Sequence, residues 1–562
     1  MRILLLTHTF NSLTQRIFIE LSGLGHDLSV EFDINDGVTE EAVELFRPHL
    51  ILAPYLRRAI PESIWRNYTT LVVHPGIVGD RGPSAIDWAI LEGESEWGIT
   101  VLQAEAEMDA GPIWATETFA MREGTKSSLY RNEVTEAALK AVLRAVERVG
   151  DYNSGTWRPT PPDEASSRGR LRPALKTEDR SIDWISDDTA TVLNKIRASD
   201  SFPGVLDALF GKPCHIFDAH EFAGHGSPGE LAGRVGDGVV KFTSDGAIWI
   251  GHAKRSDYWP GIKLPTALAF PEAAELPELL EESGDIRYQE ENGVGYLHFD
   301  FYNGAMGTTA CKRLLAAYVK ARSRPTRVIV LMGGSDFFSN GLDLNLIEAS
   351  ESPSDESSLN IEAMDDLCQA ILETDGQLTV SALQGNAGAG GAFLALAADE
   401  VWARSGVILN PHYKNMGNLY GSEFWTYRLP LRVGEDQASQ IMQNRLPIGV
   451  QEAKRLGFID DHFGKDVAEF VSQVEARASA LASSPEFTDR LSAKRSSRAI
   501  DEAAKSLAQY RSEELSHMQR NFYGFDPSYH VARHHFVQKT PHSWTPRHLA
   551  RHRELGWMVP ED

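Results

Sequence analysis

Short apolar runs alternate with helix-like patterns in two separate stretches of this 562-residue chain, and this alternation limits the possible folds more than any other feature. In residues 1–150, apolar runs of strand length are separated by segments with helical periodicity. This order predicts a mostly parallel sheet with helices on both faces. The runs lie at Arg2–Thr7, 28–32, 49–54 and Thr70–His74, and the helical patterns begin at 13–24 and end at 125–149. A second alternating stretch covers residues 286–475.

The composition changes twice between these stretches. Residues 151–173 are rich in Pro, Ser, Arg and Gly, and residues 265–282 are rich in Pro and Glu, so both are expected to be linkers. The segment between them combines a helix near 189–198 with short strands punctuated by glycine. We therefore predict an α/β multidomain protein with domains at 1–160, 174–270 and 285–475, and a helical tail at 476–562.

Charge and cysteine content limit the class of function. The 55 Lys+Arg and 79 Asp+Glu residues give a net charge of −24, whereas nucleic-acid binding needs a basic surface. The cysteines Cys214, Cys311 and Cys368 are far apart and form no CxxC motif, which favours a reducing compartment. The first residues are typical of a strand rather than a signal peptide, and no apolar run reaches membrane-spanning length. We expect a cytoplasmic protein without nucleic-acid or membrane partners.

A histidine and an aspartate are the first candidate catalytic residues. His74 ends an apolar run and precedes a glycine-rich loop, the position at which α/β sheets place ligands. Asp109 follows a later strand-like run, so the two side chains could form an acid/base pair. No G-x-G-x-x-G follows the first run, which argues against a dinucleotide site. A histidine with a purely structural role is the alternative.

The sequence around these residues resembles that of the formyltetrahydrofolate-dependent formyltransferases, above all the methionyl-tRNA formyltransferases. The run HPG…RGPSAIDWAILEGESEWGITV…MDAGPI carries the resemblance, and residues 181–184 and 196–204 resemble that family's OB-like second domain. The resemblance implies a Rossmann-like domain that uses 10-formyltetrahydrofolate, with His74 and Asp109 in an Asn–His–Asp trio. Val72 stands at the Asn position and cannot donate a hydrogen bond, so Asn11 and Gln15 are candidate substitutes. A formyltransferase fold that has lost its activity is the alternative.

Two glycine-containing turns form the second constellation. The first is FSNGLDL at 338–344, and the second is GNAGAGGA at 385–392, which leads into a helix. Backbone amides exposed at such turns can hold the oxyanion of a thioester, although tight turns of this kind are also common without a ligand. The pair resembles the crotonase (enoyl-CoA hydratase/isomerase) family, which implies a ββα spiral fold and coenzyme A thioester binding. Carried over residue by residue, the oxyanion amides are those of Leu342 and Gly390, flanked by Gly341 and Gly391.

The chain departs from the hydratases at their catalytic glutamates. Phe393 and His412 stand at those two positions, so we do not expect water addition across a double bond. A polar set follows instead and is expected near the acyl group, although each member could also be a packing residue. It comprises His412, Tyr413, Tyr420 and Glu423.

Together the two halves resemble the HypX family of hydrogenase maturation factors, and the resemblance covers nearly the whole chain. It implies transfer of the formyl group of 10-formyltetrahydrofolate to coenzyme A, with His74 and Asp109 handling protons. Decarbonylation of formyl-CoA would then give the CO ligand of NiFe hydrogenase, with Tyr420, Glu423 or His412 as the base. Maturation proteins of the hydrogenase are possible partners. The alternatives are a formyltransferase that acts on an amine and carries a crotonase scaffold, and a non-catalytic maturation partner.

The phosphates of coenzyme A need local positive charge on this acidic chain. Arg16 and Arg551 are candidates, the latter among several C-terminal arginines, and solvated helix faces are the alternative reading. Histidines four residues apart, 530/534 and 548/552, have a spacing that suits a metal, but no carboxylate motif accompanies them. We therefore expect no metal.

Overall fold

The computed structural model describes residues 1–162, 165, 167–258, 261–280 and 284–559. It divides into two compact units. Unit 1 comprises Met1–Glu281 and Pro541–Asp562, and unit 2 comprises Glu282–Thr540. Each unit is described by itself below.

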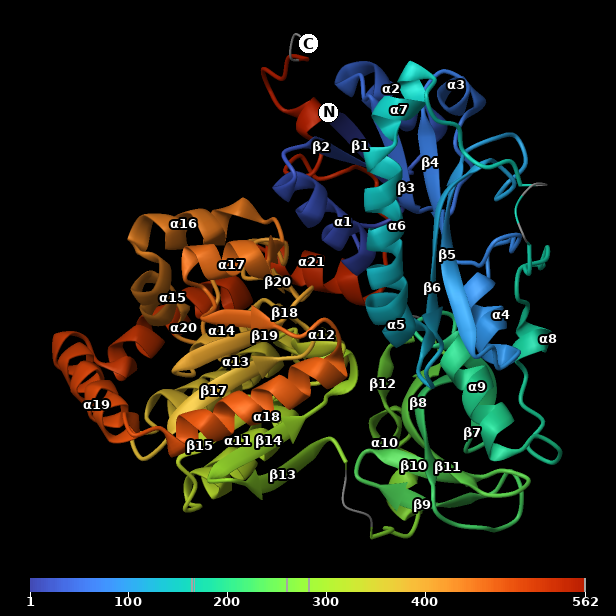
Figure 1. Ribbon diagram of the computed structural model, residues 1–562. Helices are drawn as coiled ribbons and strands as arrows, with labels where there is room; N and C mark the ends of the chain where they lie inside the picture. Colours follow the sequence, from blue (N-terminus) through green and yellow to red (C-terminus); the bar gives the residue numbers. More distant parts are fainter. Residues whose placement is uncertain (163–164, 166, 259–260, 281–283, 560–562) are drawn as a thin grey trace. The chain divides into compact units, whose positions relative to one another are not determined.

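A six-stranded sheet with the order β2-β1-β3-β4-β5-β6 forms the first half of unit 1 (Figure 1). The pairs among β1 to β4 are parallel, whereas β5 and β6 join antiparallel, so the predicted mostly parallel sheet is confirmed. The strands are β1 (Arg2–Thr7), β2 (Asp27–Phe32), β3 (Leu50–Tyr55), β4 (Thr70–His74), β5 (Glu96–Gln103) and β6 (Ile113–Ala120).

Helices cover both faces of this sheet because its strands are apolar on both sides. On β1, Leu4 and Leu6 pack in one cluster with Phe46 of α2 and Ile64 of α3. Successive strand residues face opposite ways, so Leu5 faces the other side, where α1 and α6 lie next to one another. The helices are α1 (Ser12–Gly23), α2 (Asp36–Phe46), α3 (Glu62–Trp65), α4 (Ala85–Leu91), α5 (Lys126–Leu129), the π-helical turn η1 (Tyr130–Val134), α6 (Thr135–Glu147) and α7 (Val149–Ser154).

The described part of the first predicted linker packs against the glycine-rich loop that follows β4. The Gly169 amide donates to the Val78 carbonyl (2.9 Å), and Arg81 exchanges backbone bonds with Arg170 and Arg172. A Cβ on Gly169 would lie 1.9 Å from the Asp80 nitrogen, so only glycine permits this approach. The first residues of this predicted linker belong to the helix α7 (Val149–Ser154), and composition does not reveal the packing of the rest.

An antiparallel sheet of order β7-β8-β11-β10-β9, with β12 paired to β11, forms the second half of unit 1. The helix α9 packs on β8 and on α4. The described part of the second predicted linker contains two short helices, α10 and η2, that pack on this sheet. The elements are α8 (Thr177–Arg180), α9 (Thr189–Ser199), β7 (Val205–Leu209), β8 (Lys212–Phe222), β9 (Leu231–Val235), β10 (Gly238–Phe242), β11 (Ala247–Arg255), β12 (Lys263–Pro265), α10 (Thr266–Ala269) and η2 (Pro271–Glu275).

The end of the chain packs along β2, the edge strand of the first sheet. The Val30 amide donates to the Leu549 carbonyl (2.9 Å), and the Phe32 amide donates to the Thr545 hydroxyl (2.9 Å). These contacts satisfy edge amides that no strand pairs with. Residues from 541 onward therefore belong to unit 1, so the structure divides the segment 476–562 that was expected to be one helical tail.

Unit 2 contains two sheets, of order β13-β14-β15-β17-β19-β22 and β16-β18-β20-β21. From β15 to β20, consecutive strands along the chain alternate between the two sheets, which is the repeating ββα pattern expected of a crotonase spiral. The strands are β13 (Ile286–Glu291), β14 (Val294–Phe299), β15 (Val328–Met332), β16 (Phe337–Ser339), β17 (Leu378–Leu383), β18 (Asn386–Gly388), β19 (Glu400–Arg404), β20 (Ile408–Asn410), β21 (Ile448–Gly449) and β22 (Asp461–Phe463).

The larger sheet separates two apolar cores. On β15, Ile329 and Leu331 face the core that contains α14, whereas Val328 and Val330 face a second core built with α18. Every residue of α14 is buried. The helices are η3 (Tyr302–Gly304), α11 (Thr308–Arg322), α12 (Leu344–Ala349), α13 (Pro353–Leu372), α14 (Gly390–Leu396), α15 (Trp425–Val433), α16 (Glu435–Asn444), α17 (Val450–Leu456), α18 (Val467–Ser483), α19 (Phe487–Ala504), α20 (Leu507–Tyr523) and α21 (Ser528–Val537), with η4 (Arg551–Arg553) in unit 1. In the described part of the chain, no helix combines the length and apolar character needed to cross a bilayer.

Candidate active sites

His74 lies between two carboxylates at the carboxyl end of β4. Its Nδ1 atom is 3.6 Å from Asp109 Oδ1, and its Nε2 atom is 2.9 Å from Asp80 Oδ2. The His74 ring is buried, with 4% of its surface exposed. The structure thus brings together the predicted pair, and it adds Asp80, which the sequence analysis missed. Asp80 stands in the same glycine-rich loop, six residues after His74, and that spacing was the available signal.

Asp80 is held by a cation from the segment that looked like a linker. Arg172 Nη1 contacts Asp80 Oδ1, and its Nη2 atom lies 2.6 Å from Glu92 Oε2. The Arg172 guanidinium also lies over the ring of Trp97. Asp80 is 2% exposed, and its pairing with Arg172 compensates for the burial of its charge. Its contact with Nε2 fixes the orientation of the His74 ring.

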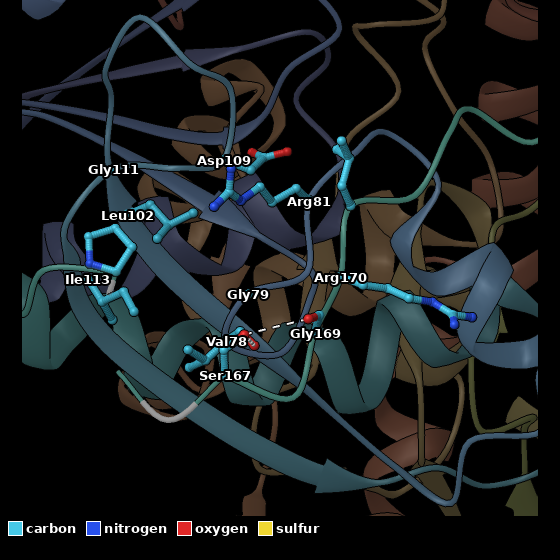
Figure 2. Close-up of a pocket in the computed structure, with 12 residues that line it drawn as sticks. Val78, Gly79, Arg81, Leu102, Asp109, Gly111, Ile113, Ser167, Gly169 and Arg170 are labelled. Atoms are coloured by element: carbon cyan, nitrogen blue, oxygen red, sulfur yellow. Dashed lines mark hydrogen bonds between the residues drawn. The ribbon is translucent and has the colours of Figure 1, made fainter. Parts of the chain in front are cut away.

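Asp109 opens onto a cavity of about 650 Å³ (Figure 2). Asp109 has a left-handed backbone (φ 56°), and its Oδ2 atom accepts a hydrogen bond from the Gly82 amide (3.1 Å), which fixes the carboxylate. The lining is mainly backbone and apolar side chains, with Arg81 and Arg170 as cations. Asp109, rather than His74, is therefore the acid/base group that this cavity exposes.

The predicted substitutes for the missing amide lie near β1. Asn11 caps α1 by accepting from the Thr14 amide (3.0 Å), and the Gln15 amide group donates to the Phe10 carbonyl (2.8 Å). In the sheet order, β3 separates β1 from β4, which carries His74. Asn11 and Gln15 thus lie at the same carboxyl edge as His74 but not on a neighbouring strand. Val72 pairs with Leu102, and its side chain offers no donor.

The two predicted phosphate anchors are already paired with carboxylates. Arg16 is mostly buried and lies 2.9 Å from Glu20 and 3.4 Å from Glu136. Arg551 lies 3.4 Å from Asp27, the first residue of β2, and so at the opposite end of the parallel strands from His74. The structure therefore does not bring Arg551 to the His74 site.

The two turns that carry Leu342 and Gly390 lie against one another in unit 2. A Cβ on Gly341, which has φ 79°, would lie 3.1 Å from the Gly390 nitrogen, and one on Gly391 would lie 2.1 Å from the Ser339 carbonyl oxygen. Only glycines allow the two turns to approach so closely. No acceptor within the described residues takes a hydrogen bond from the Leu342 or Gly390 amide. Both amides are therefore available to an oxyanion.

Glu423 faces these amides. A Cβ on Gly390 would lie 2.0 Å from Glu423 Oε1, so this oxygen is directed at the backbone of the predicted oxyanion hole. Glu423 is 1% exposed, and its Oε1 atom has no hydrogen-bond partner in the described chain. Its Oε2 atom accepts from the Tyr413 hydroxyl (2.5 Å) and the Ser422 amide (3.1 Å). Burial, together with the neighbouring Asp365 carboxylate, raises the pKa of Glu423 to about 8.

The other predicted polar residues take different places. Tyr420 stacks on His517 with a centroid separation of 4.0 Å, whereas the hydroxyl that contacts Glu423 is that of Tyr413. His412 is buried in the loop after β20. Phe393, which stands at the position of the first hydratase glutamate, is fully buried and stacks on Tyr413 with a centroid separation of 5.2 Å. This position therefore contributes to packing around Tyr413.

Two buried carboxyl groups near Glu423 escaped the sequence analysis. Asp365 on α13 and Glu514 on α20 are both fully buried, and both hydrogen-bond to the turn that carries Glu423. Burial raises the pKa of Asp365 to about 7 and of Glu514 to about 8. They lie far from Glu423 in the sequence and belong to no motif, so no sequence signal pointed to them.

The C-terminal histidine pairs have protein partners. His530 Nε2 lies 2.8 Å from the Phe522 carbonyl, and His534 Nδ1 lies 2.7 Å from Glu348. In unit 1, His552 is buried between Glu31 (2.8 Å) and Ser29 (2.6 Å). Within the described ranges, no cluster of three His, Cys, Asp or Glu residues could hold a metal ion.

Comparison with known families agrees with this architecture. Residues 33–146 match the formyl transferase model, residues 174–258 match the formyl transferase C-terminal domain, and residues 289–547 match enoyl-CoA hydratase/isomerase. A methionyl-tRNA formyltransferase of Chloroflexus aurantiacus is 29% identical over 40% of this chain and 74% of its own length. Fold and sites thus define a protein that joins a formyltransferase to a crotonase-like unit.

Relatives that share the whole architecture identify the family. The hydrogenase maturation factor HoxX of Bradyrhizobium diazoefficiens is 53% identical over 98% of this chain and 97% of its own length. The crystal structure of HypX from Aquifex aeolicus in complex with tetrahydrofolic acid has a TM-score of 0.95 and 46% identity, and each chain covers 100% of the other. The chain belongs to the HoxX/HypX family of hydrogenase maturation factors, and the predicted resemblance and fold class are confirmed.

Proposed function

We propose that this protein transfers the formyl group of 10-formyltetrahydrofolate to coenzyme A and then decarbonylates formyl-CoA to CO and coenzyme A. The observation that carries the proposal is the unpartnered oxygen of Glu423, directed at the Gly390 backbone where a thioester carbonyl would be held. The Aquifex aeolicus relative with tetrahydrofolic acid supports folate as the donor. The relatives' role in hydrogenase maturation supports CO as a ligand for NiFe hydrogenase, with maturation proteins as partners and the cytoplasm as the place of action.

In the first step, Asp109 and His74 handle the proton of the coenzyme A thiol. Asp109, which lines the cavity, accepts this proton, and the His74 imidazole held by Asp80 stabilises the charge that develops. The thiol sulfur bonds to the formyl carbon, the bond from that carbon to the folate nitrogen breaks, and the proton ends on that nitrogen. The products are tetrahydrofolate and formyl-CoA.

In the second step, Glu423 acts as the base. The Leu342 and Gly390 amides hold the thioester oxygen, and Glu423 Oε1 accepts the formyl proton. The carbon–sulfur bond breaks, CO leaves, and the proton from Glu423 ends on the thiolate of coenzyme A. Tyr413 keeps Glu423 in place by donating to its other oxygen. Phe393 and its neighbours exclude water from the site, which limits hydrolysis of formyl-CoA.

The test is to incubate the purified protein with 10-formyltetrahydrofolate and coenzyme A, and to measure formyl-CoA by mass spectrometry and CO by its capture on haemoglobin. We expect both products. Accumulated formyl-CoA without CO would contradict the second step, and the absence of both would contradict the whole proposal. His74→Ala should abolish formyl-CoA formation, whereas the control His252→Ala, which removes another carboxylate-paired histidine of unit 1, should not.

A further inference from the structure

The turn that carries Glu423 has an unusual backbone. Glu423 (φ 59°) and Phe424 (φ 57°) are consecutive residues in the left-handed region, which side chains other than glycine rarely adopt. Such a conformation persists only where surrounding contacts impose it. The contacts that impose it here come from two buried carboxyl groups on separate helices.

Asp365 of α13 holds the first half of the turn. Its Oδ1 atom accepts from the Glu423 amide (2.8 Å), and its Oδ2 atom accepts from the Ser422 hydroxyl (2.8 Å). The nearest cationic atom, Arg511 Nε, is 3.9 Å from Oδ2, and this arginine also pairs with Asp366. Asp365 is therefore a buried carboxyl group with only partial charge compensation.

Glu514 of α20 holds the second half. It accepts from the Phe424 amide (2.9 Å), from the Thr426 amide (2.8 Å) and from the Thr426 hydroxyl (2.5 Å). These three donors fix the orientation of the Glu514 carboxyl group. The Ser422 hydroxyl lies 3.2 Å from Glu514 Oε2 as well, so Ser422 bridges the two carboxyl groups.

Hydrogen-bond counting requires a shared proton in this cluster. The Ser422 hydroxyl has a single hydrogen, yet it lies within hydrogen-bond distance of an oxygen of Asp365 and of an oxygen of Glu514. Both contacts are satisfied only if one of these carboxyl groups is protonated and donates to the serine oxygen. Because Asp365 accepts from both the Ser422 hydroxyl and the Glu423 amide, the favoured arrangement is the one in which Glu514 carries the proton and donates it to the serine oxygen, in agreement with the higher pKa of Glu514.

We propose that Asp365 and Glu514 are positioning residues for Glu423, which fix its strained turn and share one proton through Ser422, so that one negative charge stays beside Glu423 and strengthens it as a base. This inference rests on the proposed role of Glu423. The titratable and charged groups that surround Glu423 are Asp365, Asp366 and Cys368 on α13, Cys311 on α11, Arg511 and Glu514 on α20, and Tyr413 in the loop before the turn. The direction of the Glu423 pKa, which is raised, agrees with a neighbouring negative charge.

Asp365→Asn removes the negative charge and keeps the shape, whereas Glu514→Gln replaces a neutral acid with a neutral amide. CO release from formyl-CoA should rise with pH as Glu423 loses its proton. Asp365→Asn should move this rise to lower pH by about one unit or more, because the like charge is gone, and Glu514→Gln should move it less. The KM for formyl-CoA should stay within about twofold, since neither residue touches the substrate. Glu513→Gln, an exposed change beside Glu514 on α20, is the matched control and should leave the profile unmoved.

An infrared titration of the protein without substrate gives a readout that does not depend on activity. The carbonyl bands of protonated carboxyl groups should include one from Glu423 that disappears last as the pH rises. This band should disappear at lower pH in Asp365→Asn, and Glu514→Gln should lack the band of the protonated Glu514 carboxyl group. Ser422→Ala, which leaves both carboxyl groups in place, should also change the bands and serves where the other variants fail to fold. An infrared titration identical to that of the wild type in all folded variants would overturn the inference. If the wild type releases no CO from formyl-CoA, the proposed function fails, and the infrared result still decides the inference.

Discussion

Asp80 in unit 1 and Asp365 in unit 2 are both buried carboxyl groups beside a candidate catalytic residue, but their surroundings differ. Asp80 is paired with Arg172 and contacts His74, so its charge is balanced within the protein. Asp365 lies among other carboxyl groups, with its nearest arginine at 3.9 Å. A balanced pair orients an imidazole, whereas an unbalanced cluster holds protons and makes a stronger base. The difference fits the two proposed steps, which are formyl transfer to a thiol in unit 1 and removal of a weakly acidic formyl proton in unit 2.

The largest effect is expected from Glu423, the proposed base. Glu423→Gln keeps the shape of the turn but cannot accept a proton, so CO release from formyl-CoA should fall by about 10²–10⁴-fold while formyl-CoA accumulates. The measurement is the rate of CO capture on haemoglobin with formyl-CoA supplied directly. Glu513→Gln, an exposed change on α20, is the control. An unchanged rate in Glu423→Gln would show that another group removes the proton.

The charge-balanced site should be broken by removing its cation. Arg172→Ala leaves Asp80 buried and unpaired, so unit 1 should lose about 3–5 kcal/mol of stability and formyl transfer should fall with it. Denaturant unfolding and formyl-CoA formation measure the two effects. Arg168→Ala is the control, because Arg168 is exposed, its contact with Glu96 is at the surface, and it does not line the cavity. Wild-type stability in Arg172→Ala would contradict a buried, charge-balanced Asp80.

A smaller effect is expected from separating His74 and Asp80 without removing either. A Cβ on Gly76 would lie 2.4 Å from His74 Nε2 and 2.5 Å from Asp80 Oδ2, so Gly76→Ala should displace the imidazole. A shift of about 1 Å should lower the rate of formyl transfer by about 10²-fold and leave CO release from supplied formyl-CoA unchanged. Gly93→Ala serves as a control for the general effect of replacing a glycine in unit 1. Gly93 has a positive φ, and a Cβ there would meet no atom within 4 Å. Equal losses in both assays would point to a folding defect instead.

The smallest effect is a difference in how pH changes the stability of the two units. Burial holds the pKa of Glu423 and Glu514 at about 8, above the ordinary value of 4.5, so folded unit 2 binds more protons than its unfolded chain in this window. Its stability should therefore be full below pH 4.5 and fall as the pH rises towards 8. In unit 1, burial acts to raise the pKa of Glu31, but contacts with His552, Thr545 and Arg553 outweigh burial and lower it. That contribution should be present above pH 4.5 and lost as the pH falls below this value.

Hydrogen exchange read by mass spectrometry at several pH values measures the two units separately. Peptides of α13 and α20 should lose protection as the pH rises from 5 to 8 relative to the intrinsic exchange rate. In Asp365→Asn the loss should be smaller. Parallel pH dependence in β2 and in α20 would contradict the proposed difference between the units.

The sequence predicted the residues that belong to local motifs, and it missed those that only the fold brings together. His74 and Asp109 were predicted because formyltransferase-like sequence motifs surround them. Leu342 and Gly390 were predicted because each lies in a glycine-containing turn. Arg172 was missed because a Pro- and Ser-rich segment gives no sign of where it packs. Asp365 and Glu514 stand in ordinary helical patterns, and only the packing of α13 and α20 around the Glu423 turn makes them neighbours.

The same limit explains the differences in fold. The positions of several strands followed from periodicity, and β1 and β4 have the predicted bounds. The division of the C-terminal segment could not be predicted, because it depends on hydrogen bonds between β2 and residues more than 500 positions away. Glu31 contacts Thr545 and His552, and an edge amide of β2 donates to Thr545. Arg551 was proposed as a phosphate anchor from its charge alone, and its place beside Asp27 follows from this same packing.

The relay of one formyl group through both units is the central claim, and an isotope experiment tests it most directly. The protein is supplied with 10-formyltetrahydrofolate carrying ¹³C in the formyl group and with unlabelled coenzyme A, and the released gas is analysed by mass spectrometry. The account predicts ¹³CO in proportion to the formyl donor consumed, and none when coenzyme A is omitted. Consumption of the labelled donor without ¹³CO, or equal ¹³CO without coenzyme A, would contradict it.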